Sequence, residues 1–167
     1  MIWYVLLIGA VAVERAAELI VSQRNLSWSR TRGGVEFGAR HYPAMVALHT
    51  GLLAGCLLEA LYRPFLPALG WPMLAVVLAA QGLRWWCIAT LGQQWNTRVV
   101  VIPDAARVTG GPYRFFSHPN YVAVVVEGIA LPLVHTAWVT AVVFTALNAV
   151  VLRTRVGVEN AALARLR

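Results

Sequence analysis

One polar segment in the C-terminal half combines residue types that can bind a charged or aromatic ligand. It reads Gly-Pro-Tyr-Arg-Phe-Phe-Ser-His-Pro-Asn-Tyr over residues 111–121 and lies between apolar runs. His118 precedes a proline, which disfavours the α region for the residue before it, so an extended or turn conformation is expected there. A turn-rich polar cluster at the edge of apolar runs is costly unless it binds something. The segment therefore favours an enzyme.

Ionisable residues also lie inside the apolar runs. Arg84 is about eight residues, or 12 Å, from the end of its run, and Glu127 is about as deep in a later one. Such groups cost about 2.5–3.5 kcal/mol each on insertion scales and usually mark a functional site or a buried pair. For Glu14, Arg15 and Glu18 the alternative is a purely structural ion pair, because Arg15 can pair with Glu18 one helical turn away. Together these charges favour a polar interior cavity.

A third candidate pair lies near the end of the chain. Arg155 and Glu159 are four residues apart and share one face of a helix. A simple surface ion pair is the alternative, but Arg before Glu is the poorer orientation for helix support, which favours a functional role. His41 and His49 are expected to be packing or interface residues, and no spacing of Cys or His indicates a metal site.

The composition is that of an integral membrane protein with one domain. Of the 167 residues, 59% are hydrophobic and 13% charged, against about 25% charged in soluble domains. The net charge is +7 and every basic residue is arginine. These arginines cluster in alternate loops, as the positive-inside bias predicts, so a nucleic-acid partner is not expected. The clusters are Arg24, Arg30, Arg32 and Arg40; Arg98, Arg107 and Arg114; and Arg153, Arg155, Arg165 and Arg167.

The apolar runs predict the elements that must position these residues. They cover residues 2–21, 43–61, 71–91, 121–134 and 137–152, separated by polar loops at 22–42 and 93–120. The first three runs are long enough to cross a bilayer, which takes about 20 residues. The fourth covers only about 21 Å, so residues 121–152 are predicted to form a helical hairpin followed by a helical tail. Residues 97–103 could form a brief extended segment.

The fold class expected is therefore all-α: an integral membrane bundle of about five membrane helices, the last two forming a hairpin. The single domain, 1–167, would comprise N-terminal helices (1–70) and a cofactor-binding core (71–167). If the arginine-rich loops are cytoplasmic, the 111–121 segment and the tail face the cytoplasm. The expected location is the inner membrane of a bacterium, in contact with membrane lipids.

Three pieces of the chain, in order, resemble the isoprenylcysteine carboxyl methyltransferase family, whose members are membrane enzymes that use S-adenosylmethionine. The resemblance spans roughly residues 82–163. The family usually has two adjacent acids where this chain has Glu159 and Asn160, and often an arginine where it has Ser117. The three pieces are Leu83-Arg84 with Leu91-Gly92 and Trp95-Asn96; the 111–121 segment; and Arg155, Glu159, Asn160 and Leu163.

The resemblance implies a role for each matching residue, with no metal. Arg84, Arg155 and Glu159 would be catalytic, the two arginines facing the acceptor. Trp95, Asn96, Arg98 and Glu127 are assigned to the acceptor site. The cofactor would be S-adenosylmethionine, lined by Gly111, Tyr113, His118, Pro119 and Tyr121 and closed from the tail by Glu159 and Asn160.

Two further stretches bear on the acceptor. Residues 38–49 and 94–103 are similar to a bacterial branch of the family that is associated with alkylpyrones and alkylresorcinols, whose ring hydroxyl is O-methylated. A lipophilic small molecule methylated at oxygen is therefore expected, either such a hydroxyl or a prenylcysteine-like carboxylate. The alternatives are a membrane reductase of similar hairpin fold that uses NADPH, and a non-enzymatic membrane module. The sequence does not determine the oligomeric state.

Overall fold

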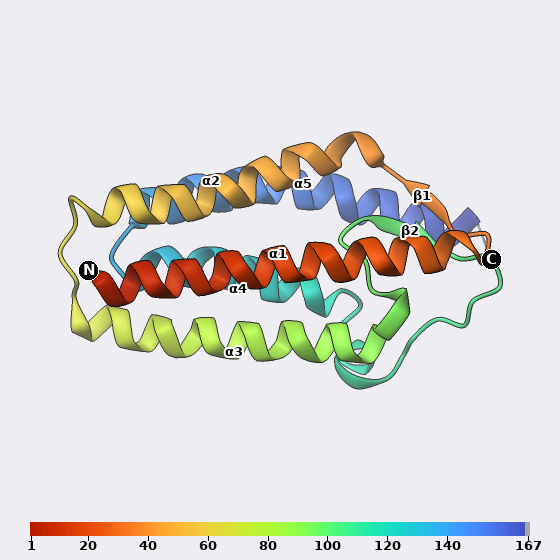
Figure 1. Cartoon of the computed structure of the whole chain (residues 1–167), viewed down its shortest axis with the longest axis horizontal. Helices are drawn as coiled ribbons and strands as arrows, with labels where there is room; N and C mark the ends of the chain where they lie inside the picture. The colour runs from red at the N-terminus through yellow and green to blue at the C-terminus, as the bar shows by residue number, and fades with distance from the viewer. Residues whose placement is uncertain (166–167) are drawn as a thin grey trace.

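Five α-helices run side by side along the long axis of the molecule (Figure 1). The computed structural model describes residues 1–165, so the last two residues of the expected domain lie outside the described part. The helices are α1 (Ile2–Arg30), α2 (Tyr42–Ala60), α3 (Pro67–Leu91), α4 (Pro119–Leu133) and α5 (Trp138–Arg165). The predicted all-α bundle is confirmed.

Helix α1 continues beyond the apolar run 2–21 from which it was expected, and this continuation makes up about one third of the helix. The polar stretch 22–30 was expected to be loop, but it contains no glycine or proline and continues the helix. Its Ser22, Asn25 and Ser29 side chains are buried against the rest of the protein. The helix ends just before Gly33, whose φ of +75° is readily adopted only by glycine.

A short antiparallel ribbon closes the end of the bundle that carries the polar loops. Strand β1 (Val35–Phe37) pairs with β2 (Val99–Val101), with Val35 opposite Val101 and Phe37 opposite Val99. The extended segment expected at 97–103 therefore contains β2, whereas β1 lies in a stretch for which no strand was predicted. The ribbon links the α1–α2 connection to the loop after α3. Two of the loops that contain arginine clusters are therefore held together.

The predicted C-terminal hairpin is present. Helices α4 and α5 meet at a tight turn in which Thr136 has a φ of 58°, and the Thr136 hydroxyl donates to the carbonyl of Pro64 at 2.5 Å. The tail is a direct continuation of α5. This continuity carries Arg155 and Glu159 on the same helix that crosses the bundle.

Within residues 1–165, three helices are long and apolar enough to cross a membrane: Ala39–Ala60, Pro67–Gln94 and Trp138–Ala164. Helix α4 is apolar but shorter, as the sequence indicates. Helix α1 is not among the three, although the run 2–21 was expected to qualify. The physical reason is that Glu14, Arg15 and Glu18 lie in its middle.

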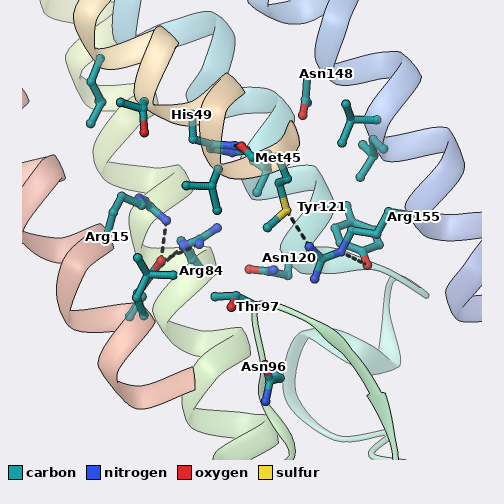
Figure 2. A pocket seen from close by; sticks show the side chains of 18 of the residues that line it. Arg15, Met45, His49, Arg84, Asn96, Thr97, Asn120, Tyr121, Asn148 and Arg155 are labelled. Atoms are coloured by element: carbon teal, nitrogen blue, oxygen red, sulfur yellow. Dashed lines mark hydrogen bonds and ion pairs between the residues drawn. The ribbon is translucent and has the colours of Figure 1, made fainter. Parts of the chain in front are cut away.

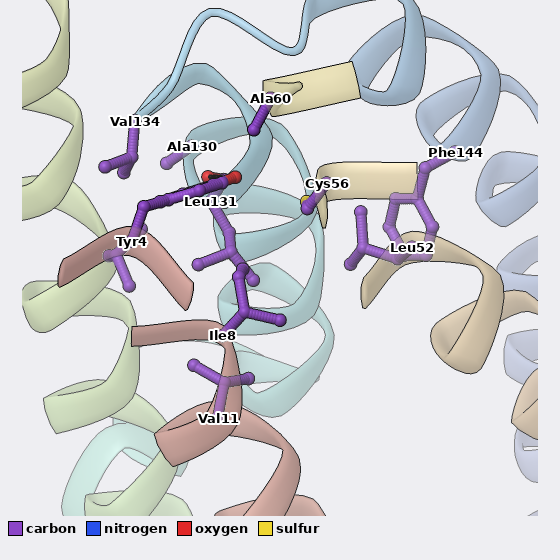
Figure 3. Packing of buried hydrophobic residues seen from close by; sticks show 11 residues of the cluster. Tyr4, Ile8, Val11, Leu52, Cys56, Ala60, Ala130, Leu131, Val134 and Phe144 are labelled. Carbon is purple, nitrogen blue, oxygen red and sulfur yellow. Dashed lines mark hydrogen bonds between the residues drawn. The ribbon is translucent and has the colours of Figure 1, made fainter. Parts of the chain in front are cut away.

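The hydrophobic core lies toward the end of the bundle that holds the N-terminus (Figure 3). Buried apolar side chains from α1, α2, α4 and α5 meet there, and the Tyr4 hydroxyl donates to the carbonyl of Leu131 at 3.0 Å. Packing becomes more polar toward the opposite end. The core residues include Tyr4, Ile8, Val11, Leu52, Cys56, Ala60, Ala130, Leu131, Val134 and Phe144.

Candidate functional site

Two cavities adjoin each other at the polar end of the core. The larger has a volume of about 370 Å³ and lies among α1, α2, α4, α5 and the segment after α3. The smaller, of about 120 Å³, lies among the 94–101 segment, the 111–121 segment and the last turns of α5. Both are lined by Trp95, Asn96, Asn120, Tyr121 and Arg155. These five residues form a common wall, part of which is visible in Figure 2.

The larger cavity has an apolar side on the outer surface of the bundle. Ala12 and Ala16 of α1 and Val46 of α2 line it, and all three are exposed on the surface. The cavity therefore opens between α1 and α2. An apolar molecule could enter from the side of the bundle.

Arg84 lines the larger cavity, but its charge is already neutralised. Its Nε and Nη2 donate to the two carboxylate oxygens of Glu18 at 2.5 and 2.6 Å. Arg15 extends the network, because it donates to Glu18 at 2.9 Å and to Glu127 at 3.0 Å. The structural pairing of Arg15 with Glu18 is thus present. Of the three guanidinium nitrogens of Arg84, only Nη1 is buried without a hydrogen-bond partner among residues 1–165.

Arg155 lines both cavities and has a different environment. Its Nε donates to the Tyr121 hydroxyl at 2.9 Å and its Nη1 to the sulfur of Met45 at 2.7 Å (Figure 2). The residue is only 7% exposed, yet no described carboxylate lies within ion-pair distance of it. A buried guanidinium without a counter-ion is costly, so the site suits an anionic ligand.

The smaller cavity combines a carboxylate with aromatic rings. The Tyr121 hydroxyl donates to Glu159 Oε2, and Nδ1 of His118 is 3.7 Å from Glu159 Oε1. The His118 and Tyr121 rings stack with centroids 5.3 Å apart. Tyr113 also lines the cavity, and burial raises the pKa of its phenol, which is therefore neutral at physiological pH. The structure thus brings the 111–121 segment and the tail into contact.

The common wall contains further polar atoms without protein partners. Nε1 of Trp95 and Oδ1 of Asn120 are both buried and make no hydrogen bond within residues 1–165. Trp95 is 2% exposed, which separates it from Trp85 and Trp86 at the surface. An indole donor and an amide acceptor therefore remain for a ligand at the wall.

Asn96 helps to build the wall and does so through its own amide. Its Nδ2 donates to the Ser22 carbonyl at 3.2 Å, and its Oδ1 accepts from the Ser22 hydroxyl at 2.7 Å. Asn25 likewise donates to the carbonyl of Trp95 at 2.7 Å. Both partners lie in the part of α1 that was expected to be loop. Helix α1 therefore fixes the segment that carries Trp95 and Asn96.

Two residues expected in the acceptor site lie outside the larger cavity. Arg98 donates to Glu36 at 2.6 Å, stacks over the Tyr42 ring at 4.2 Å and lines only the smaller cavity. Glu127 belongs to the Arg15 network and lines a separate cavity of about 20 Å³. Each of these two residues therefore forms an ion pair that connects two parts of the fold.

Three residues assigned to the cofactor line neither cavity. Gly111 has a φ of +54°, and a Cβ there would collide with the Thr90 side chain. Pro119 is buried at the start of α4, where a proline needs no N–H partner. Asn160 is exposed on α5. Gly111 and Pro119 shape the 111–121 segment, whereas Asn160 lies on the outer face of α5.

Sequence reasoning missed several lining residues. Asn120 lies inside the 111–121 segment but was not assigned a role, although its position between Pro119 and Tyr121 was a usable signal. His49 was expected to be a packing residue, yet it lines the larger cavity together with Met45 and Asn148. Nothing in the sequence pairs α2 with α5, so these three could not be found from it.

One family model and one curated relative match the chain. The model of the isoprenylcysteine carboxyl methyltransferase (ICMT) family matches residues 73–165. The chain is 37% identical over 164 residues to the uncharacterized protein YpbQ of Bacillus subtilis (strain 168), covering 98% of this chain and 96% of that protein. No solved structure matches the chain.

Proposed function

We propose that this chain, which belongs to the isoprenylcysteine carboxyl methyltransferase family, uses S-adenosylmethionine to methylate an oxygen of a lipophilic acceptor. Membership makes it a membrane methyltransferase, while the cofactor and the acceptor are the proposed parts. One observation carries the proposal: a polar cavity and an apolar cavity share a wall that contains Arg155 and Tyr121. Such an arrangement allows a water-soluble donor and a lipidic acceptor to meet.

The smaller cavity fits the cofactor by the chemistry of its residues. Glu159 offers a carboxylate to a positively charged group, and the rings of His118 and Tyr121 offer flat surfaces to a base or a cation. Trp95 and Asn120 add a donor and an acceptor that no described residue satisfies. When bound, S-adenosylmethionine supplies an electrophilic methyl group.

Arg155 would hold the reacting oxygen of the acceptor. Its guanidinium lacks a protein counter-ion and lies at the wall between the cavities. A carboxylic acid has a pKa of about 3.5 and is already ionised at neutral pH, so the site needs no general base. The Tyr121 hydroxyl bridges Arg155 and Glu159 and so fixes one relative to the other.

Positioning is the main contribution that the chain can make to the reaction. Holding a nucleophile in line with an electrophile can supply about 7–11 kcal/mol of the barrier. The apolar lining of the larger cavity excludes water from the acceptor oxygen, which strengthens its contact with Arg155. Prenylcysteine-like carboxylates and long-chain alkylpyrone hydroxyls combine an acidic oxygen with an apolar tail. An alkylresorcinol hydroxyl also has the apolar tail, but as a phenol with a pKa of about 10 it would have to release its proton to water before or during the transfer. We place the active site on the cytoplasmic side of a bacterial inner membrane.

The proposal is tested with purified protein in detergent. S-adenosylhomocysteine should bind in calorimetry and NADPH should not, because Glu159 in the smaller cavity can pair with the positively charged amino group of S-adenosylhomocysteine, and NADPH carries no such group. Labelled S-adenosylmethionine added with a lipid extract should transfer its methyl group to an extractable lipophilic product. Binding of NADPH without S-adenosylhomocysteine would favour a reductase instead. Binding of neither cofactor would leave the non-enzymatic module as the better account.

A further inference from the structure

Two polar side chains face the apolar part of the larger cavity, away from the shared wall. His49 projects from α2 and Asn148 from α5, and both line the cavity (Figure 2). Asn148 is only 4% exposed. The methyl-transfer site proposed above uses neither residue. A polar pair inside an apolar cavity is costly unless something satisfies it.

The two residues lie within about one helical turn of the same level of the bundle. Helices α2 and α5 are antiparallel, because Glu59 accepts from Thr140 at one end and Met45 accepts from Arg155 at the other. His49 is four residues from Met45, or about 6 Å along α2. Asn148 is seven residues from Arg155, or about 10 Å along α5. Both therefore lie about 6–10 Å from the Arg155 level.

Their hydrogen-bonding capacities are complementary. Nδ1 of His49 lies 2.9 Å from the Met45 carbonyl. Because a carbonyl can only accept, Nδ1 carries the hydrogen, and Nε2 of the neutral ring is left as an acceptor. The Asn148 amide offers two N–H donors and one acceptor. Among residues 1–165, no hydrogen bond involves the Asn148 amide or Nε2 of His49.

We infer that His49 and Asn148 form a second subsite of the acceptor cavity, which recognises a hydroxyl group on the acceptor. A hydroxyl can donate to His49 Nε2 and accept from Asn148 Nδ2 at once, which a carbonyl or a hydrocarbon cannot. A plain alkyl chain would leave both groups buried and unpaired. The inference rests on the proposed function. It specifies an amphiphile that carries an acidic oxygen at Arg155 and a hydroxyl about 6–10 Å further along.

Hexadecanoate and its mid-chain hydroxyl derivative serve as probes for the subsite. Their dissociation constants are measured with the full chain in detergent and saturating S-adenosylhomocysteine. The wild-type protein should bind the hydroxylated acid about tenfold more tightly, since two neutral hydrogen bonds contribute about that much. His49→Phe and Asn148→Leu should each abolish the preference while binding hexadecanoate as well as before or better.

Thr145→Val is the matched control. Thr145 lies on the same helix, but its hydroxyl donates to the Ala141 carbonyl at 2.7 Å and does not line the cavity. This variant should keep the tenfold preference. Calorimetry with S-adenosylhomocysteine shows in parallel that each variant is folded.

The outcomes separate this inference from the proposed function. Equal binding of the two acids by the wild-type protein, or an unchanged preference in both variants, overturns the hydroxyl subsite. Methylation of hexadecanoate in parallel samples that contain labelled S-adenosylmethionine in place of S-adenosylhomocysteine would then still support the methyltransferase. If neither acid binds although S-adenosylhomocysteine does, the cavity is not an acceptor site, and the subsite is refuted with it.

Discussion

At the scale of single residues, the two buried arginines at the cavities have different tasks. Arg84 is held by both oxygens of Glu18, whereas Arg155 contacts only a phenol and a sulfur. An arginine that is already paired adds little attraction for a second anion, because its charge is compensated. The structure therefore favours Arg155 as the contact for an anionic oxygen, with Nη1 of Arg84 as an auxiliary donor.

Substituting each arginine by methionine should separate these tasks. Arg84→Met leaves Glu18 buried without its main partner, and we expect a loss of about 3–5 kcal/mol in the free energy of unfolding. Arg155→Met breaks no ion pair among residues 1–165, so stability should change by less than about 1 kcal/mol while methyl transfer to an acidic acceptor is lost. Unfolding in denaturant and methyl transfer from labelled S-adenosylmethionine provide the measurements.

Glu18→Gln serves as the companion variant to Arg84→Met. Combined with Arg84→Met, it removes the buried charge that the single change leaves behind, so the double variant should be more stable than Arg84→Met alone. A double variant that is no better, or an Arg155→Met protein that unfolds as readily as Arg84→Met, would refute this division of roles.

At the scale of elements, contacts between helices determine how the site is built. The polar third of α1 holds the segment with Trp95 and Asn96, and the turn between α4 and α5 returns the chain along the bundle. Ala137, the residue before helix α5, has no polar side chain that could cap the helix. Instead, Glu59 of α2 accepts from the N–H groups of Val139 and Thr140 at 3.1 and 2.8 Å. A carboxylate there satisfies orphan donors and favours the positive end of the helix dipole.

Removing this cap should destabilise the bundle. Glu59→Ala leaves two N–H groups and the Thr140 hydroxyl without an acceptor, and we expect a loss of about 1–2 kcal/mol in the free energy of unfolding. Glu59→Gln keeps an acceptor oxygen and should lose less than half of that. Thermal unfolding in detergent measures both. Equal stability of Glu59→Ala and the wild-type protein would show that the cap is not needed.

At the scale of the whole molecule, the bundle is divided into an apolar half and a polar half. The core of large side chains occupies the half with the N-terminus, and the two cavities occupy the half where the loops converge (Figures 1 and 3). The opening between α1 and α2 connects the larger cavity with the outer surface. The division places the smaller cavity and the larger cavity on either side of one wall.

A bulky residue at the opening should therefore hinder entry of the acceptor and leave binding of the cofactor unchanged. Ala16→Phe should raise the KM for a lipidic acceptor at least about tenfold, because it obstructs the path between α1 and α2, without changing the affinity for S-adenosylhomocysteine. Ala17→Phe is the matched control: Ala17 is the next residue, also exposed, and does not line the cavity. Similar KM values for the two variants would argue against entry at this place.

The sequence by itself determined which residues gather at the polar end. Apolar runs and helix breakers predict the hairpin, which is a local feature because it depends on spacing along the chain. That His118, Tyr121 and Glu159 belong together was implied by the resemblance of their segments to the methyltransferase family. The continuation of α1 was missed because polarity was read as loop, although no residue in 22–30 breaks a helix.

Only the tertiary structure decided how the charges are shared among these residues. Arg84 and Glu18 are 66 positions apart, and Arg15 and Glu127 are 112 apart. No periodicity in the sequence relates residues on helices that are not adjacent in the chain. The sequence therefore did not distinguish Arg84 from Arg155, and it did not show that Glu127, which was assigned to the acceptor site, pairs with Arg15. Burial at a low dielectric makes each charge take the nearest opposite partner, and the packing of α1 against α3 and α4 supplies that partner to Arg84 but not to Arg155.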